Sequence, residues 1–156
     1  MTKISVLLLA VSLTACVSVR ETPAPQAPAM ERRAISTDKA PAAIASYSQA
    51  ILAGDNLYLA GQIGLDPATR QLVPGGLPAE ARRALDNCRA VLEAAGFTLA
   101  DVVQVQVYLV DINDYELFNQ TYAGFFPNPQ PARAVVAVAA LPRGARVEIL
   151  MTAVRR

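Results

Sequence analysis

The chain has 156 residues, of which 53% are hydrophobic, so it can bury the core of one globular domain and carry short appendages. Fourteen basic and thirteen acidic residues give a net charge of +1, without the basic excess that is typical of nucleic-acid-binding proteins. Because the chain has no histidine, Ser-His-Asp and Cys-His catalysis and the usual zinc and haem sites are excluded. We therefore expect no metal, no cofactor and no nucleic-acid partner.

Residues 1–15 predict an export signal. Lys3 precedes an apolar stretch, Ile4 to Val11, that is shorter than the about 20 residues needed to span a bilayer. Leu13-Thr14-Ala15-Cys16 then resembles a bacterial lipobox, in which the signal is cleaved before the cysteine and the cysteine is lipidated. We expect Cys16 to anchor the protein to a membrane, facing the periplasm or the cell exterior. The alternative is an ordinary secretory signal with a chance cysteine.

Residues 16–34 predict a flexible tether, because they are rich in proline and alanine and contain few large apolar side chains. The alternative is an ordered arm. The globular domain is then expected over residues 35–156.

The first half of the domain predicts one strand and one long helix. Residues 35–48 contain a proline and are too interrupted for a central strand over their whole length. Residues 55–62 alternate and predict a strand. Residues 78–95 place apolar side chains at helical spacing, and Cys88 lies on that stripe. We interpret Cys88 as a core residue rather than a nucleophile.

The second half begins with a strand over residues 102–110. One face carries Val103, Val105, Val107 and Leu109, and the other carries Gln104, Gln106 and Tyr108. A second subunit is one candidate to cover the wetter face. Asn113 and Glu116 resemble a capping box at the start of a helix that ends near Phe126. We expect its aromatic side chains to face the core: Tyr115, Phe118, Tyr122 and Phe125 or Phe126.

Residues 131–140, read as PARAVVAVAA, predict a largely buried strand in which Arg133 is the only charge. A guanidinium keeps its proton and must find groups to receive its hydrogen bonds. One interpretation is a structural ion pair, or a side chain that reaches water at the end of the strand. The other is an anchor for a small anion, because the planar fork binds carboxylates in a bidentate way.

The last strand is expected over residues 146–154, with Glu148 as its only carboxylate. Glu148 is either a solvated residue or partner of Arg143 or Arg146, or part of a functional site. The order of elements, strand-helix-strand-helix-strand-strand, predicts an α+β fold with two helices packed on one face of a mixed sheet.

Several stretches, in order, resemble the RidA (YjgF) family of imine and enamine deaminases over residues 39–156. They are APAAIASYSQA, LAGQIGLDPATR, LDNCRAVLEAAGFTLADVVQVQVYLVDINDYELFNQTYAGFF, PARAVVAVAALPRGARVEI and AVRR. The resemblance implies a chorismate-mutase-like homotrimer with its sites in the clefts between subunits.

The resemblance also implies roles for individual residues. Arg133 matches the family's carboxylate-binding arginine, and Glu148 matches the glutamate that helps place the attacking water. Substrate-binding positions match Tyr47, Gly61 and Asn119, together with the backbone carbonyl of Val135. The chain departs from the family pattern at Ala60, where many members have serine, at Val135, where many have cysteine, and in the short segment 127–130.

The last two strands, if paired as a hairpin, would place Glu148 opposite about Ala137, roughly 13 Å along from Arg133. A site shared between two subunits removes that difficulty.

Two functions are therefore expected. The first is a hydrolytic deaminase that converts 2-imino or 2-enamino acids to 2-keto acids and ammonia, with Arg133 on the carboxylate and Glu148 orienting water. The alternative is a non-catalytic lipoprotein module that holds a small carboxylate in the same cleft. A ribonuclease role is disfavoured by the neutral charge.

Overall fold

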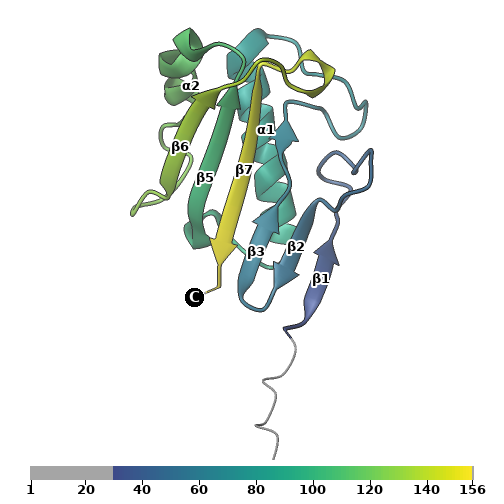
Figure 1. Cartoon of the computed structure of the whole chain (residues 1–156). Coiled ribbons are helices and arrows are strands. Elements are labelled where there is room, and N and C mark those ends of the chain that lie inside the picture. Colours follow the sequence, from purple (N-terminus) through teal and green to yellow (C-terminus); the bar gives the residue numbers. More distant parts are fainter. Residues whose placement is uncertain (1–29, 156) are drawn as a thin grey trace, which may run out of the picture.

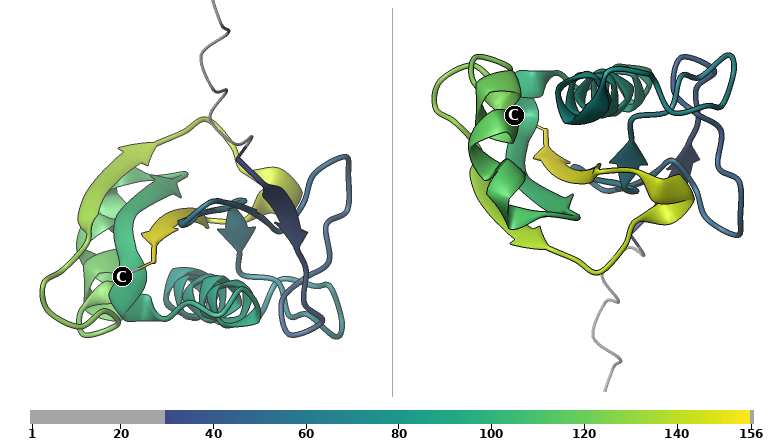
Figure 2. Two further views of the ribbon diagram at one scale, coloured as in Figure 1. Left: turned by 90° about the horizontal axis from the view of Figure 1, so that it is seen from below. Right: turned by 90° about the horizontal axis from the view of Figure 1, so that it is seen from above.

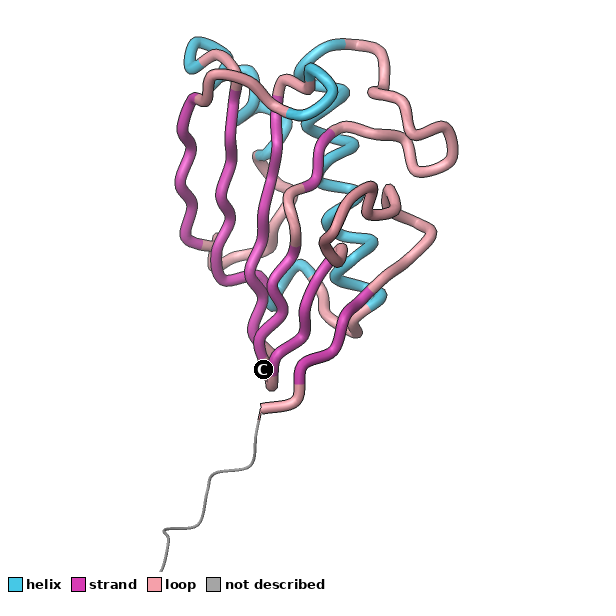
Figure 3. Tube along the Cα trace, turned by 45° about the vertical axis from the view of Figure 1, so that its right-hand side comes forward, coloured by secondary structure: helices cyan, strands magenta, loops and turns pink. Residues whose placement is uncertain are grey.

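A computed structural model describes residues 30–155, which form a mixed β-sheet with two α-helices on one of its faces (Figures 1 and 2). The predicted α+β fold is confirmed. In chain order the strands and α-helices are β1 (Arg32–Ile35), β2 (Ala50–Ala53), β3 (Asn56–Leu59), β4 (Gln62–Ile63), α1 (Gly76–Ala94), β5 (Val102–Leu109), α2 (Tyr115–Tyr122), β6 (Ala132–Ala137) and β7 (Val147–Val154). The loops over residues 36–49 and 64–75 lie on one side of the molecule (Figure 3).

The strand order is β1-β2-β3-β7-β5-β6, and β4 also pairs with β7. All neighbours are antiparallel except β5 and β6, which are parallel because α2 makes the crossover between them. The hairpin considered for the last two strands does not form. The segment after β6 contains a short 3-10 turn, Pro142–Gly144, and carries the chain past β5, so that β7 pairs with the opposite edge of β5.

The N-terminal part of the domain contains two strands that the sequence pattern did not predict. β1 and β2 form an antiparallel meander with β3. β1 begins at Arg32, three residues before the expected start of the domain at residue 35. Only Ile35 of β1 is buried, so this strand is defined by its pairing with β2 rather than by an apolar pattern.

The predicted signal over residues 1–15, Cys16 and most of the tether lie outside the described residues. Within residues 30–155, no helix has the length and apolar character to cross a membrane.

Helix α1 packs its apolar stripe against the sheet and forms the centre of the core. Cys88 is fully buried there, as predicted, and burial raises the pKa of its thiol. The thiol is therefore held in its neutral form and serves as a packing group.

Strand β5 alternates as predicted for Val105, Val107 and Leu109, which are buried. The prediction that Val103 shares this buried face is wrong, because its side chain is 47% exposed. A register shift between Val102 and Gln104 explains the difference, since an irregularity of one residue moves a side chain to the other face.

Helix α2 starts differently from the prediction. The 3-10 turn Ile112–Asp114 precedes it, and the Asp111 side chain accepts a hydrogen bond from the backbone N–H of Asn113 at 2.9 Å. The expected capping box of Asn113 and Glu116 does not form, because the chain is already turning at Asp111. Among the aromatic residues of this helix, Phe118 and Tyr122 are buried, as expected.

Strand β6 is shorter and more exposed than predicted. It lies at the edge of the sheet, and Val136 is 47% exposed in the single chain. Val135 is the part of β6 that packs against the core. The apolar composition of residues 131–140 therefore does not reflect burial within one chain, because no strand of the described residues covers the outer edge of β6.

Candidate functional site

Two of the predicted site residues, Gly61 and Glu148, form a first group and meet at the junction between β3 and β4. Glu148 on β7 pairs with Ile63 of β4, and its carboxylate lies against Gly61, between the two strands. A Cβ atom at residue 61 would overlap the Glu148 side chain. The absence of a side chain at residue 61 therefore leaves the space that the Glu148 carboxylate occupies.

The Glu148 carboxylate has no ion-pair partner within residues 30–155. The interpretation that it pairs with Arg146 is wrong, because the Arg146 guanidinium lies 3.9 Å from Asp114. Burial raises the pKa of Glu148 above its ordinary value. A carboxyl with a raised pKa and no counter-ion is suited to accept and return a proton.

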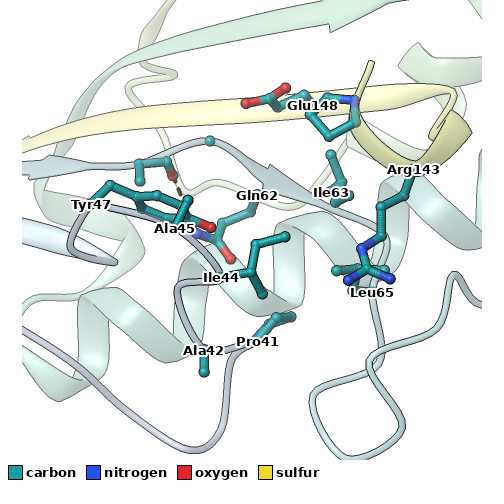
Figure 4. A pocket seen from close by; sticks show the side chains of 13 residues that line it. Pro41, Ala42, Ile44, Ala45, Tyr47, Gln62, Ile63, Leu65, Arg143 and Glu148 are labelled. Carbon is teal, nitrogen blue, oxygen red and sulfur yellow. Dashed lines mark hydrogen bonds between the residues drawn. The ribbon is translucent and has the colours of Figure 1, made fainter.

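Tyr47 stands on the loop over residues 36–49, beside a cavity of about 400 Å³ that Gly61 and Glu148 also line (Figure 4). The buried side chain of Gln49 holds this loop. Its Oε1 accepts from the Thr37 N–H at 2.6 Å, and its Nε2 contacts three carbonyl oxygens, those of Thr37, Ala40 and Pro41. One side chain therefore fixes the loop that carries Tyr47.

The second group lies between β6 and α2. Arg133 is half-buried, and its guanidinium carbon lies 4.4 Å from the centre of the Tyr122 ring. Its Nη2 donates to the Tyr115 hydroxyl at 3.2 Å. No carboxylate of the described chain forms an ion pair with Arg133, so the structural ion pair considered above is not found. Aromatic rings orient the guanidinium and leave most of its donors available.

Two buried polar atoms without hydrogen-bond partners lie on α2 near Arg133. They are Asn119 Oδ1 and the Tyr122 hydroxyl. Asn119, Tyr122 and Arg133 line a second cavity of about 400 Å³. The Asn119 oxygen can accept a hydrogen bond and the Tyr122 hydroxyl can donate or accept one, so both are available, beside Arg133, to a polar group that enters this cavity. Burial raises the pKa of Tyr122, and the nearby Arg133 charge opposes that rise.

Sequence reasoning placed Tyr115 and Tyr122 in the core and missed their contact with Arg133. The spacing of residues 115, 119 and 122 was the available signal, because it places all three side chains on one side of a helix. Pairing them with Arg133 also needed the parallel register of β5 and β6, which the pattern did not reveal.

Val135 packs its side chain against the core. The Val138 N–H donates to the Leu109 carbonyl of β5, and backbone groups alternate in direction along a strand. The N–H and C=O of Val135 therefore point away from β5, toward the open edge of the sheet. The Val135 carbonyl is thus directed outward, as the predicted use of it requires.

The structure does not bring the two groups together in one chain. Arg133 is in register with Val105 of β5 and then with Met151 of β7, whereas Glu148 is three residues away along β7. This offset, across two strand spacings, separates the two Cα atoms by roughly 14 Å. Because three is odd, the two side chains also point to opposite faces of the sheet.

The model of the family described as Endoribonuclease L-PSP matches residues 37–155. The 2-iminobutanoate/2-iminopropanoate deaminase of Capra hircus is 52% identical over 124 residues, 80% of this chain and 90% of that protein. The Homo sapiens protein of the same name is 49% identical over the same shares of both chains.

Two solved structures show the same fold. RidA from the Antarctic bacterium Psychrobacter sp. is 44% identical, with a TM-score of 0.76 over 79% of this chain and 99% of that chain. Escherichia coli TdcF with bound serine is 35% identical, with a TM-score of 0.76 over 80% of this chain and 99% of that chain.

Proposed function

The chain belongs to the Endoribonuclease L-PSP family, and from this premise we propose that it hydrolyses 2-imino and 2-enamino acids to 2-keto acids and ammonia. Relatives about 50% identical over most of the chain carry the name of this activity. The observation that carries the proposal is the Glu148 carboxylate, which has a raised pKa and no counter-ion and lies beside a cavity at Gly61.

In the proposed reaction, Arg133 binds the substrate carboxylate through two of its N–H donors. Asn119 lines the same part of the pocket. Glu148, with the outward-directed carbonyl of Val135, orients a water molecule toward C2 of the imine and accepts its proton. The C–O bond forms and the proton passes to nitrogen, which gives a carbinolamine. The new hydroxyl group then gives up its own proton, which also passes to nitrogen by way of Glu148. The C=O bond forms as the C–N bond breaks, and ammonia leaves. An enamine enters the same path after taking up a proton at C3.

The complete site is proposed to lie between subunits of a homotrimer. Arg133 and Glu148 point to opposite faces of the sheet. Within one chain they therefore cannot both contact the same small imino acid, which supports a site built by two chains. The exposed edge of β6 and the uncovered sheet face, where Tyr58 is 50% exposed, are candidate contact surfaces.

The membrane location is a separate proposal, supported by the lipobox-like sequence that ends at Cys16. We expect Cys16→Ser to move the protein from the membrane fraction to the soluble fraction. If both proteins are soluble, the lipoprotein proposal is wrong, and the proposed chemistry is unaffected.

The test of the reaction supplies the full chain with imines formed in place by an amino-acid oxidase. We expect ammonia and 2-keto acid to be released faster than by the oxidase alone. With the Glu148→Gln protein, the rate should return to that of the oxidase alone. If 2-keto acids bind but no imine is hydrolysed faster, the non-catalytic carboxylate-binding module is the correct function. An RNA substrate, cleaved by the wild type and spared by Glu148→Gln, would instead support a nuclease.

A further inference from the structure

The cavity beside Glu148 has a second charged side chain in its lining. Arg143 belongs to the 3-10 turn Pro142–Gly144 and lines the same cavity of about 400 Å³. No carboxylate forms an ion pair with it within residues 30–155. The cavity therefore combines a carboxylate for the reaction with a guanidinium that has no anionic partner.

Apolar side chains separate these two charges. Figure 4 shows the Glu148 carboxylate directed toward the Tyr47 side of the cavity and the Arg143 guanidinium directed toward Leu65. Ile63 is drawn between them, and Ile44 also lines the cavity, lower in the view. A ligand that follows this lining has its reacting atom at Glu148, a short hydrocarbon chain along the isoleucines, and an anionic group at Arg143.

We propose that the cavity accepts a 2-imino acid with a second carboxylate at the end of its side chain, of which the imine of glutamate is the simplest probe. The inference rests on the proposed function and names the substrate class of that same site. The first carboxylate binds Arg133 of a neighbouring subunit, C2 lies at Glu148, and the distal carboxylate binds Arg143. Water adds its oxygen to C2 and ammonia leaves, which gives 2-oxoglutarate without any oxidant or reductant.

The size of the cavity agrees with this class. The relatives described above are named for 2-iminobutanoate and 2-iminopropanoate, whose side chains have two carbons and one. Such side chains would leave much of a cavity of about 400 Å³ to water and would not reach a second charge.

The backbone at Arg143 allows a clean test. Its φ is 59°, in the left-handed region, where asparagine is better tolerated than most residues. Arg143→Asn therefore removes the charge without adding backbone strain. Arg70 offers a matched control, because it is exposed, has a φ of 58° and lies outside the cavity lining.

The experiment compares kcat/KM of the full chain for the imines of glutamate and of 2-aminobutanoate. We expect the wild type to prefer the glutamate imine, and Arg143→Asn to lower the ratio of the two values about tenfold, the effect of one charge-assisted hydrogen-bonded contact. Arg143→Lys should restore part of the ratio, and Arg70→Asn should leave it unchanged. A ratio that Arg143→Asn does not alter overturns the inference.

Calorimetry with the keto acids separates this inference from the reaction. If the imine of 2-aminobutanoate is hydrolysed but 2-oxoglutarate binds no more tightly than 2-oxobutanoate, the substrate class is wrong and the reaction stands. If neither imine is hydrolysed, the proposed function fails. In that case, tighter binding of 2-oxoglutarate that is lost in Arg143→Asn would still support the two-carboxylate site. If 2-oxoglutarate shows no such preference, the two-carboxylate site is overturned as well.

Discussion

At the scale of single residues, Arg133 is held by aromatic rings rather than by a carboxylate. Its guanidinium carbon lies 4.4 Å from the Tyr122 ring centre. Such a contact contributes only about 0.5–1 kcal/mol to stability at a partly exposed site. A structural ion pair would leave an unpaired buried charge when broken, at a cost of several kcal/mol. The two roles of Arg133 are therefore separable by one substitution.

We expect Arg133→Ala to fold with a melting temperature close to that of the wild type and to lose roughly ten- to hundredfold in turnover, because charge-assisted hydrogen bonds to the substrate are lost. Arg133→Lys should remain poor, since an ammonium group cannot form the bidentate contact. The melting temperature and imine hydrolysis are measured on the same samples. Wild-type turnover in folded Arg133→Ala would exclude the anchor.

Glu148 predicts opposite effects of pH on stability and on activity. Burial raises its pKa above the ordinary 4.5, so the folded chain holds this proton more tightly than the unfolded chain. The contribution of Glu148 to the free energy of unfolding is therefore largest below 4.5 and falls as the pH rises through the raised pKa.

We expect Glu148→Gln to have a higher melting temperature than the wild type at neutral pH, and the difference to disappear in acid. Turnover by the wild type should fall as the pH decreases through the raised pKa, because the protonated carboxyl cannot accept a proton from water. Melting curves and rates are recorded from pH 4 to about pH 8. A Glu148→Gln protein that is less stable than the wild type at neutral pH contradicts this account.

At the scale of elements, the loop over residues 36–49 depends on Gln49, whose side chain is 3% exposed. Gln49→Glu retains an acceptor for the Thr37 N–H but loses the amide donor to three carbonyl groups. We expect destabilisation by about 1–3 kcal/mol. We also expect faster amide exchange in this loop and a KM that rises more than kcat falls, because the loop carries Tyr47.

The control is Gln71→Glu, a similar change at an exposed position of another loop. It should alter neither amide exchange over residues 36–49 nor KM. Unchanged exchange in Gln49→Glu would show that the loop is held by other contacts.

The elements also show how far the sequence predicts this fold. The repeat along α1 was sufficient, because this helix buries one continuous face, and the repeat along β5 held from Val105 to Leu109 but not at Val103, beside the register shift. β1 and β2 were not predicted, because each has only four residues and is defined by backbone pairing rather than by an apolar pattern. The sequence suggested a hairpin for the last two strands only as a possibility, because neighbouring strands often pair, whereas here β5 separates β6 from β7. The candidate residues of the site were identified by resemblance. That Arg133 and Glu148 lie on opposite faces of the sheet could be seen only from the register of β6, β5 and β7.

At the scale of the whole molecule, the separation of Arg133 and Glu148 predicts complementation between two impaired variants. In a trimer that mixes Arg133→Ala and Glu148→Gln chains, a site can receive Arg133 from one chain and Glu148 from the other. Random assembly in equal amounts would restore about a quarter of the sites.

Complementation is measured as imine hydrolysis after the two variants are unfolded together and refolded, with each variant refolded alone as the control. Sedimentation of the wild type at micromolar concentration should show a trimer. A monomer, or a mixture no more active than its components, would exclude a site shared between chains.

The path of the chain also fixes the direction in which the cleft faces. β1 starts at one end of the sheet, and β7, with Glu148 next to its first residue, starts at the other (Figure 1). Whatever is joined ahead of residue 30 is therefore attached at the end remote from the carboxylate. A chain fixed to a surface through its N-terminal side would turn the mouth of the cleft outward, where small solutes arrive by free diffusion. For the same reason, an affinity tag or carrier protein can be joined at the C-terminal end of the chain and leave the entrance open, because β7 ends at the end of the sheet where β1 begins (Figure 1).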